Sequence, residues 1–298
     1  MTTTQPYQAA TPEILAWIAS ETSRGCTRTA TFGAMLQAGW SPVSAGLAMQ
    51  LTLGESQALG VPANALVQGE FVPATVPVPK PVLHPLAGAT DKFTVDGGDG
   101  AVAVLQRIDD PDVLVFSQLL SAEECSALID AARPRLSASL TVDIQTGGEE
   151  LHPDRTSQGM FFARGENEVV TRLEARIAKL LGWPIENGEG LQILRYPPGA
   201  QYRPHYDYFD PAQPGTPAIL TRGGQRVATL IVYLHEPEGG GATVFPDIAL
   251  SVAPVRGNAV FFSYGQAHPA SRSLHGGEPV THGEKWIATK WLREREFS

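Results

Sequence analysis

The chain has 298 residues, which is enough for one substantial domain and a smaller one. Its apolar content of 43% and charged content of 18% are those of an ordinary soluble globular protein, and its formal net charge of −9 argues against general binding to nucleic acid phosphates. No apolar run is long enough to cross a bilayer, and residues 1–10 do not form a secretory signal. Cys26 and Cys125 are too few for a disulfide framework, so we expect reduced thiols, a cytoplasmic location and no membrane partner.

Residues 1–70 are predicted to form a small helical module. Thr11 followed by Pro12 suits the start of a helix, and Ser41 followed by Pro42 repeats this start further along the chain. Apolar residues at helical spacing mark the inward faces of the module: Ile14, Leu15, Ile18, Phe32, Met35, Leu36, Leu47 and Leu51. The pattern therefore predicts three short helices that pack on one another.

Three short helices also fit the outline of a DNA-reading helix-turn-helix. Between residues 1 and 59, however, Arg24 and Arg28 stand against Glu13, Glu21 and Glu55, which is a poor electrostatic footprint for DNA. We therefore expect no nucleic acid partner. The module is interpreted as a packing or substrate-presenting appendage, with substrate recruitment or homodimer formation as hypotheses.

Residues 71–100 are predicted to link this module to the rest of the chain. Within them, residues 72–85 read VPATVPVPKPVLHP and should run extended as a semi-rigid polyproline II spacer. Residues 97–100 add a flexible glycine turn. As alternatives, the proline-rich segment could dock across the following domain or mimic a proline-containing substrate.

Residues 101–298 are predicted to form the main domain, with helical signals first and strand signals later. After a short apolar run at 113–116, Ser121 and Glu124 form a capping box, and residues 168–181 repeat apolar residues at helical spacing before Gly182. Short strands are then predicted at 192–196, 225–234, 242–245, 250–252, 259–264 and 285–291. This order predicts an α+β fold whose strands form an antiparallel barrel or sandwich.

Two histidines and a carboxylate are candidate metal ligands. His205 and Asp207 lie two residues apart in RYPPGAQYRPHYD, and in a strand this spacing puts both side chains on one face, although the pair alone equally fits a solvated turn. His275 could supply a third ligand and complete a two-His, one-carboxylate triad, which leaves open positions on iron where a structural zinc site would close with four ligands. Lys285 opens the run KWIATKW, in which a strand could direct its cation into the same cavity.

Residues 113–292 resemble the prolyl 4-hydroxylase-like group of iron(II)/2-oxoglutarate oxygenases. The resemblance is carried by six ordered motifs: VLVFSQLLSAEECSALID, RTSQGMFF, LQILRYPPGAQYRPHYDYF, TLIVYLHEPEGGGATVFP, RGNAVFFSY and SLHGGEPVTHGEKWIATKWL. It implies a double-stranded β-helix of the jelly-roll or cupin-like type, buttressed by helices. It also implies Fe(II) held by His205, Asp207 and His275, and 2-oxoglutarate bound through its distal carboxylate by Lys285.

The activity that this resemblance implies is a dioxygenase reaction. The co-substrates would be 2-oxoglutarate and O2, with ascorbate as a further candidate cofactor, and the products would be succinate, CO2 and a hydroxylated C–H bond. The carboxylate at Asp207 favours hydroxylation over halogenation. The expected substrate is a prolyl residue of a peptide or protein, and the alternatives are a free amino acid, a small natural product, or a non-catalytic protein that senses metal and oxo acid.

Three tyrosines match aromatic positions that line the cofactor pocket of this group: Tyr196, Tyr202 and Tyr233. Tyr196 and Tyr233 could hydrogen-bond 2-oxoglutarate, and Thr243 is a further candidate. Each tyrosine is equally compatible with a core ring whose hydroxyl finds another partner. Lys285 could also be a solvent-facing strand lysine, whereas Lys290 lies at odd spacing from it and should face the other way.

Several other residues are alternative candidates for metal binding or substrate contact. His268 and His282 lie close enough in sequence to replace His275 as a ligand, and His84, His152 and His235 are interpreted as loop or surface residues. Arg155 and Arg164 could contact substrate or form surface ion pairs. Residues 145–159 are polar and contain glycine, so they are a candidate mobile substrate loop.

Overall fold

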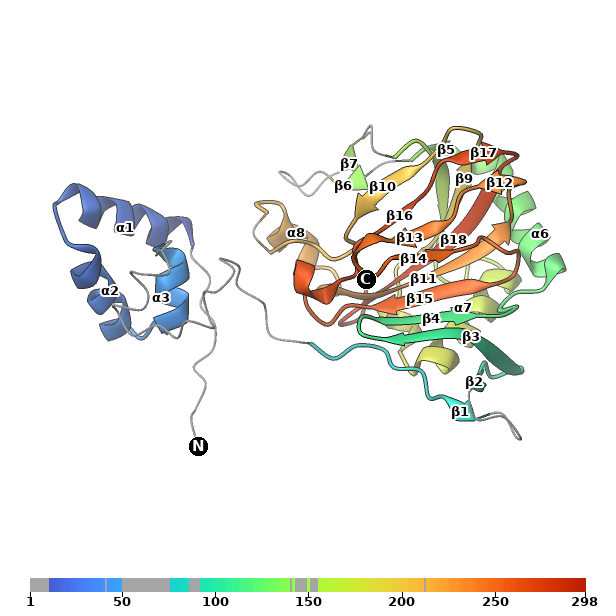
Figure 1. Cartoon of the computed structure of the whole chain (residues 1–298), viewed down its shortest axis with the longest axis horizontal. Coiled ribbons are helices and arrows are strands. Elements are labelled where there is room, and N and C mark those ends of the chain that lie inside the picture. The colour runs from blue at the N-terminus through green and yellow to red at the C-terminus, as the bar shows by residue number, and fades with distance from the viewer. Residues whose placement is uncertain are drawn as a thin grey trace. The chain divides into compact units, whose positions relative to one another are not determined.

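The structure is a computed structural model that describes residues 11–40, 42–49, 76–85, 92–139, 141–142, 149–150, 155–211 and 213–298. The chain divides into two compact units, Met1–Val72 and Pro73–Ser298 (Figure 1). The α-helices are α1 (Pro12–Ser23), α2 (Arg28–Gln37), α3 (Pro42–Ala48), α6 (Ala122–Ala132), α7 (Glu168–Leu181) and α8 (Thr216–Leu220). Short 3₁₀ helices are η1 (Arg133–Arg135), η2 (Ile185–Asn187), η3 (Pro246–Ile248) and η4 (Pro269–Ser271).

All strands among the described residues belong to the second unit. The first nine are β1 (His84–Pro85), β2 (Phe93–Asp96), β3 (Ala101–Asp109), β4 (Asp112–Phe116), β5 (Ser137–Ala138), β6 (Thr141–Val142), β7 (Glu149–Glu150), β8 (Gln158–Phe162) and β9 (Leu191–Tyr196). The others are β10 (Tyr202–His205), β11 (Arg226–His235), β12 (Gly239–Gly240), β13 (Thr243–Phe245), β14 (Leu250–Val252), β15 (Ala259–Ser263), β16 (His275–Gly277), β17 (Val280–His282) and β18 (Lys285–Arg293).

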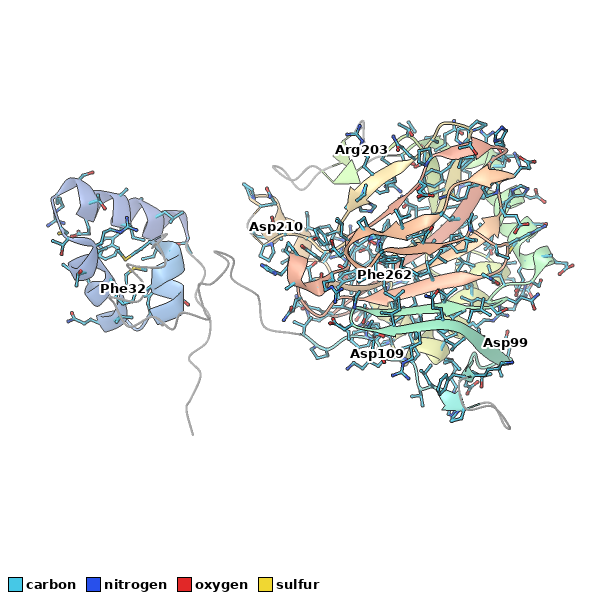
Figure 2. All side chains as sticks on the ribbon, in the orientation of Figure 1. Phe32, Asp99, Asp109, Arg203, Asp210 and Phe262 are labelled. Atoms are coloured by element: carbon cyan, nitrogen blue, oxygen red, sulfur yellow. The ribbon has the colours of Figure 1, made fainter. Side chains whose placement is uncertain are left out.

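The first unit contains α1, α2 and α3 around a small apolar core. The predicted start of α1 is confirmed, because the Thr11 hydroxyl accepts a hydrogen bond from the backbone N–H of Ile14 at 3.4 Å. Phe32 (Figure 2) and Met35 are buried as predicted, and tryptophans at positions 17 and 40 pack against them. Leu15 and Leu36 are 45% and 37% exposed, so their predicted inward orientation is wrong. Leu15 follows Ile14 directly and therefore lies about 100° around the helix from the buried stripe.

The second unit begins before residue 101, so the predicted boundary of the linker is wrong. β2 lies within residues 71–100 but pairs with β3, and Val95 is 2% exposed in the main core. The proline-rich residues 76–85 also lie along this unit, because the Val76 N–H donates to the Gly265 carbonyl at 2.7 Å and Leu83 packs on the same core. For these residues the docking alternative describes the structure better than a free spacer.

Two antiparallel sheets face each other in the second unit (Figure 1). Among the described residues, ten strands form one sheet in the order β1-β2-β3-β4-β15-β11-β18-β9-β8-β5, and four form the other in the order β10-β16-β13-β14. One core lies between the sheets and includes Tyr233 and Phe262 (Figure 2) from the large sheet and Phe245 from the small one. The opposite face of the large sheet packs on α6 and α7. This arrangement is a double-stranded β-helix buttressed by helices.

The two predicted buttressing helices are confirmed. The Ser121 and Glu124 side chains form the capping box of α6. Helix α7 covers residues 168–181 as predicted, and it ends at Gly182, which has a left-handed φ of 61°. No described helix has the length and apolarity needed to cross a membrane.

The six predicted strands are present, with ends that shift by at most two residues. β8 was missed, and its first two residues lie within the predicted substrate loop, 145–159. β10 ends at His205, so Asp207 follows the strand instead of lying within it. The prediction that His205 and Asp207 lie on one face of a continuous strand is therefore wrong, although their side chains still converge.

Candidate active site

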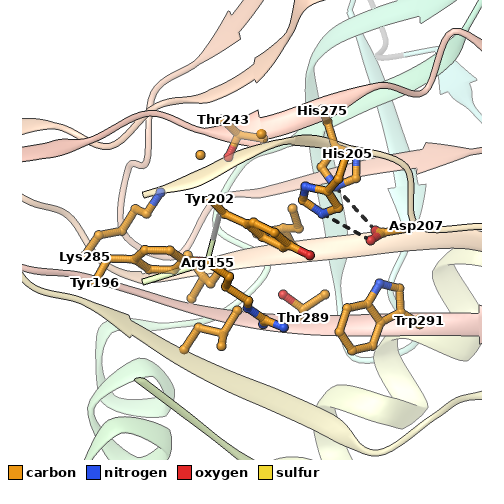
Figure 3. A pocket seen from close by; sticks show the side chains of 15 residues that line it. Arg155, Tyr196, Tyr202, His205, Asp207, Thr243, His275, Lys285, Thr289 and Trp291 are labelled. Atoms are coloured by element: carbon orange, nitrogen blue, oxygen red, sulfur yellow. Dashed lines mark ion pairs between the residues drawn. The ribbon is translucent and has the colours of Figure 1, made fainter. Parts of the chain in front are cut away.

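Strand pairing in the small sheet brings the three candidate ligands together. β10 and β16 are antiparallel neighbours, and their register places His205 opposite His275. Asp207 lies two residues beyond the end of β10, with its carboxylate beside both imidazoles (Figure 3). Its Oδ1 is 3.5 Å from Nε2 of His205, and its Oδ2 is 3.4 Å from Nε2 of His275. One donor atom from each residue lies within 4.8 Å of the others.

A backbone carbonyl fixes the tautomer of each histidine. Nδ1 of His205 lies 2.8 Å from the carbonyl oxygen of Arg203, and Nδ1 of His275 lies 3.0 Å from that of Ser273. Because a carbonyl oxygen only accepts, each Nδ1 carries the hydrogen and each Nε2 keeps its lone pair. Both lone pairs are therefore available on the side of the ring that faces Asp207.

The charge states of the triad also suit a metal ion. Burial lowers the pKa of His275 to about 4, against an opposing effect of Asp207, so this ring is neutral at neutral pH. Burial alone would raise the pKa of the Asp207 carboxyl, but the two imidazoles beside it outweigh that effect and the pKa lies well below its usual range. Two imidazole nitrogens and one carboxylate oxygen are the donor set of a facial iron triad, so the residues present fit Fe(II).

Lys285 provides a buried cation at the other end of the same cavity (Figure 3). Its side chain is 2% exposed, and Nζ donates to the Gly241 carbonyl at 2.7 Å and lies 4.6 Å from the ring centre of Tyr196. Burial lowers its pKa to about 8, with Glu278 acting in the opposite direction. No described carboxylate forms an ion pair with it, so an anionic ligand would have an unopposed partner here.

Two glycines keep the space beside this ammonium open. A Cβ at Gly277 would lie 3.3 Å from Nζ of Lys285, and one at Gly241 would lie 3.3 Å from Cδ. Gly241 also has a φ of +75°, which other residues rarely adopt. The pocket around Lys285 therefore fits the carboxylate of 2-oxoglutarate.

The predicted pocket residues fall into two groups. Tyr196, Tyr202 and Thr243 line the cavity between Lys285 and the triad (Figure 3), and the Tyr202 ring stacks on His205 with 3.6 Å between ring centres. Tyr233 is fully buried behind Thr243, to whose hydroxyl it donates at 2.8 Å. Thr243 therefore keeps its own hydroxyl hydrogen available for another acceptor.

Trp291 is a cavity residue that sequence reasoning missed. Lys285, Ile287, Thr289 and Trp291 alternate along β18 and all line the cavity. The Trp291 side chain is 7% exposed, and its indole N–H, which is fully buried, has no hydrogen-bond partner among the described residues. The two-residue alternation from Lys285 was the signal that could have identified it.

A buried ion-pair network packs against Trp291. The Arg226 guanidinium lies 3.8 Å from the ring centre of Trp291 and pairs with Glu189 at 2.7 Å. Glu189 also pairs with Arg293 at 2.6 Å. Lys290 faces away from the cavity, as its odd spacing predicted, but it is 2% exposed and forms an ion pair with Glu174 of α7 at 2.5 Å.

The remaining candidates fall outside the described metal cluster. His268 accepts from the backbone N–H of Ala270 through Nδ1, and the ring of His282 is exposed. His84 and His235 are also exposed, and His152 lies outside the described residues. Residues 145–148 and 151–154 of the predicted substrate loop, 145–159, are likewise not described.

The two arginines that are candidates for substrate contact have different surroundings. Arg155 is buried at the cavity wall, where it donates to the Gln192 side chain at 2.7 Å and lies over the Tyr202 ring. Arg164 instead donates to the backbone carbonyls of Glu186 and Gly188, so its contacts connect two loops. Of the two, only Arg155 lines the cavity.

Comparison with known proteins identifies a family and several relatives of this chain. Residues 191–293 match the family described as the 2OG-Fe(II) oxygenase superfamily. Prolyl 4-hydroxylase 1 of Arabidopsis thaliana is 42% identical over 207 residues, which cover 63% of this chain and 71% of that protein. Prolyl 4-hydroxylase 5 of the same plant is 40% identical over 211 residues, covering 63% and 70%. A solved viral collagen prolyl hydroxylase from Paramecium bursaria Chlorella virus-1 is 32% identical, covers 61% of this chain and 95% of that chain, and has a TM-score of 0.48.

Proposed function

The chain belongs to the prolyl 4-hydroxylase family of the 2OG-Fe(II) oxygenase superfamily, and from this premise we propose that it hydroxylates prolyl residues of a peptide or protein. The observation that carries the proposal is one cavity with a two-histidine, one-carboxylate triad at one end and, at the other, an ammonium to which no described carboxylate is paired. A protein that kept only the fold would have no need of both groups.

His205, Asp207 and His275 would hold Fe(II) through two imidazole nitrogens and one carboxylate oxygen. When bound, the iron supplies the oxidising chemistry by which 2-oxoglutarate and O2 become succinate and CO2 and one oxygen atom enters a C–H bond. The carbonyls of Arg203 and Ser273 hold the imidazoles in the tautomer that the metal needs.

Lys285 and Thr243 orient the co-substrate. The Lys285 ammonium would bind the distal carboxylate as a charge-assisted pair in a site that excludes water. Thr243, whose hydroxyl is held by Tyr233, would donate to the same carboxylate. These contacts place the oxo acid end of the molecule toward the triad.

Trp291 and Tyr202 form an aromatic wall beside the triad and suit a pyrrolidine ring. The unpartnered indole N–H of Trp291 is available to a carbonyl of the substrate backbone. A prolyl peptide offers both an apolar ring and a neighbouring carbonyl, and this combination supports a peptide over a free amino acid.

An anaerobic titration with Fe(II) and 2-oxoglutarate tests the site. We expect a visible charge-transfer band in the wild type and in Lys179→Ala, an exposed lysine of α7, but not in His205→Ala or Lys285→Ala. Absence of the band in the wild type would overturn the proposal.

The substrate is tested with a proline-rich peptide and a matched peptide in which alanine replaces each proline. We expect succinate release and a mass gain of one oxygen atom with the first peptide alone. Equal succinate release with both peptides would contradict prolyl hydroxylation. We also propose that ascorbate sustains turnover by keeping the iron ferrous. The cytoplasmic location and the homodimer stay predictions from the sequence.

A further inference from the structure

A buried chain of hydroxyl groups reaches Asp207 from the large sheet. Thr229 of β11 donates its hydroxyl to Oδ2 of Asp207 at 2.7 Å. The Thr229 hydroxyl lies 2.8 Å from that of Tyr264, which follows β15. Thr229 is 0% exposed and Tyr264 is 2% exposed, so water does not compete for these contacts. β11 and β15 are paired neighbours, which fixes the distance between the two residues.

The direction of this chain follows from the charge on Asp207. An ionised carboxylate only accepts hydrogen bonds, so Thr229 must use its single hydroxyl hydrogen toward Oδ2. The Thr229 oxygen can then only accept from Tyr264, and the Tyr264 phenol is the donor at the start of the chain. Each hydroxyl therefore has one orientation, and the carboxylate is held at the end of the chain.

The two carboxylate oxygens of Asp207 consequently differ. Oδ2 is engaged by Thr229, whereas no described hydroxyl or backbone N–H donates to Oδ1, which faces Nε2 of His205 at 3.5 Å. Rotation of the carboxylate plane away from this orientation would break the bond to Thr229 in a buried site. The orientation of the carboxylate is thus set before any metal binds.

We propose that Thr229 and Tyr264 are positioning residues for the metal: they hold Asp207 in one orientation and leave Oδ1 as its metal donor. This inference rests on the proposed function, because it takes the triad as the iron site. Hydrogen-bond partners of metal ligands typically contribute about 10- to 100-fold to metal affinity. Thr229 and Tyr264 act through Asp207 and need not touch the metal or the substrate.

The test is titration of the full-length apoprotein with Co(II), whose absorption reports binding without turnover. We expect the dissociation constant of Thr229→Val to rise about 10- to 100-fold, because valine keeps the shape and removes the hydroxyl. Thr229→Ser restores the hydroxyl and should bind within about threefold of wild type. Tyr264→Phe should weaken binding by a smaller factor, since Thr229 can still donate to Asp207.

Ser263→Ala is the matched control. Ser263 is 6% exposed on the neighbouring strand and donates to Oδ2 of Asp112 at 2.9 Å, so the variant removes a similar buried bond from a carboxylate outside the triad. We expect its Co(II) affinity to equal that of wild type. Equal weakening in Ser263→Ala and Thr229→Val would show a general packing effect and overturn the proposal.

Two further outcomes separate this inference from the proposed function. Wild-type Co(II) affinity in Thr229→Val overturns the positioning role and leaves the iron site standing, whereas no Co(II) binding by the wild type overturns the iron site itself. If circular dichroism shows that Thr229→Val does not fold, Tyr264→Phe tests the positioning role instead, because this substitution removes only one oxygen atom. Unchanged affinity in a folded Tyr264→Phe would then overturn the chain of hydroxyl groups.

Discussion

If Lys285 binds 2-oxoglutarate as proposed, we expect this binding to depend on pH. Only the ammonium form can pair with a carboxylate, and burial lowers the pKa of the unliganded lysine to about 8. We expect the affinity for 2-oxoglutarate to be constant below pH 8 and to fall about tenfold per pH unit above it, since each unit removes that fraction of ammonium. The charge-transfer titration, repeated at several pH values, measures this. A flat affinity up to about pH 9.5 would contradict the role of the ammonium.

The same burial costs stability in the unliganded protein. Because the folded pKa of about 8 lies below the ordinary 10.5, the unfolded chain binds more protons between these two values, and the free energy of unfolding rises with pH across that window. The cost is present in full below pH 8 and is on the order of 3 kcal/mol. We therefore expect Lys285→Met to be more stable than wild type in denaturant at neutral pH, with a smaller advantage at about pH 10. An equally large gain in unfolding free energy at both pH values would show that the effect of Lys285→Met comes from packing and not from the removed charge.

Trp291 is expected to determine the affinity for the peptide. Trp291→Phe keeps a ring against Arg226 but removes the indole N–H that has no described protein partner. We expect the KM for a proline-rich peptide to rise about tenfold, the effect of one lost hydrogen bond, with kcat changed less than about twofold. The affinity for 2-oxoglutarate, measured by the charge-transfer band, serves as the control. An unchanged KM would mean that the indole N–H does not meet the substrate.

At the scale of elements, one buried ion pair connects α7 to β18. Lys290 donates to Glu174 at 2.5 Å and also to the carbonyl of Glu189, and both side chains are at most 4% exposed. We expect Lys290→Met to lose about 3–5 kcal/mol of unfolding free energy, because Glu174 would remain buried and uncompensated.

The double variant Lys290→Met with Glu174→Leu tests that explanation. Removing both charges should recover most of the loss, since an apolar pair often replaces a buried ion pair at little cost. Denaturant unfolding of the two single variants and the double variant measures the coupling. Additive losses would show that the two charges are independent.

The elements that could be predicted from the sequence are those whose signal is local. Helix α7 was located at residues 168–181 because its apolar period, its glycine end and its length all lie within one stretch. β8 and β2 were missed because β8 begins within the predicted substrate loop and β2 lies within the predicted linker. β10 could not be bounded because its end at His205 depends on its pairing with β16.

The site shows the same difference between features with a local sequence signal and features that depend on the fold. The triad and Lys285 were identified from motifs, whereas the tautomers of the two histidines depend on carbonyls that only the fold places. Lys290 was correctly predicted to face away from Lys285, but its burial against Glu174 required the packing of α7 on the sheet. Contacts between distant segments are thus what the sequence alone did not supply.

At the scale of the whole molecule, the division into two units predicts that the second is self-sufficient. Met1–Val72 has its own apolar core, and both sheets belong to Pro73–Ser298. We expect a chain of residues 73–298 to bind Fe(II) and 2-oxoglutarate within about twofold of the full chain and to unfold as one cooperative transition. Charge-transfer titration and calorimetry measure these properties.

Removing residues 76–85 as well provides the contrast, because the Val76 N–H bonds to the Gly265 carbonyl and Leu83 packs on the core. We expect this shorter chain to be less stable than residues 73–298. A large loss of 2-oxoglutarate affinity on removing residues 1–72 alone would instead show that the helical module takes part in the site.

The pairing of β10 with β16 also bears on how the protein is made. His205 and His275 become neighbours only after the ribosome has added β16 and that strand has folded back onto β10. A growing chain that ends before His275 carries two of the three proposed ligands, so we expect it to hold iron weakly. Oxygen activation would then be withheld from unfinished chains, whose exposed methionines and cysteines would be its nearest targets.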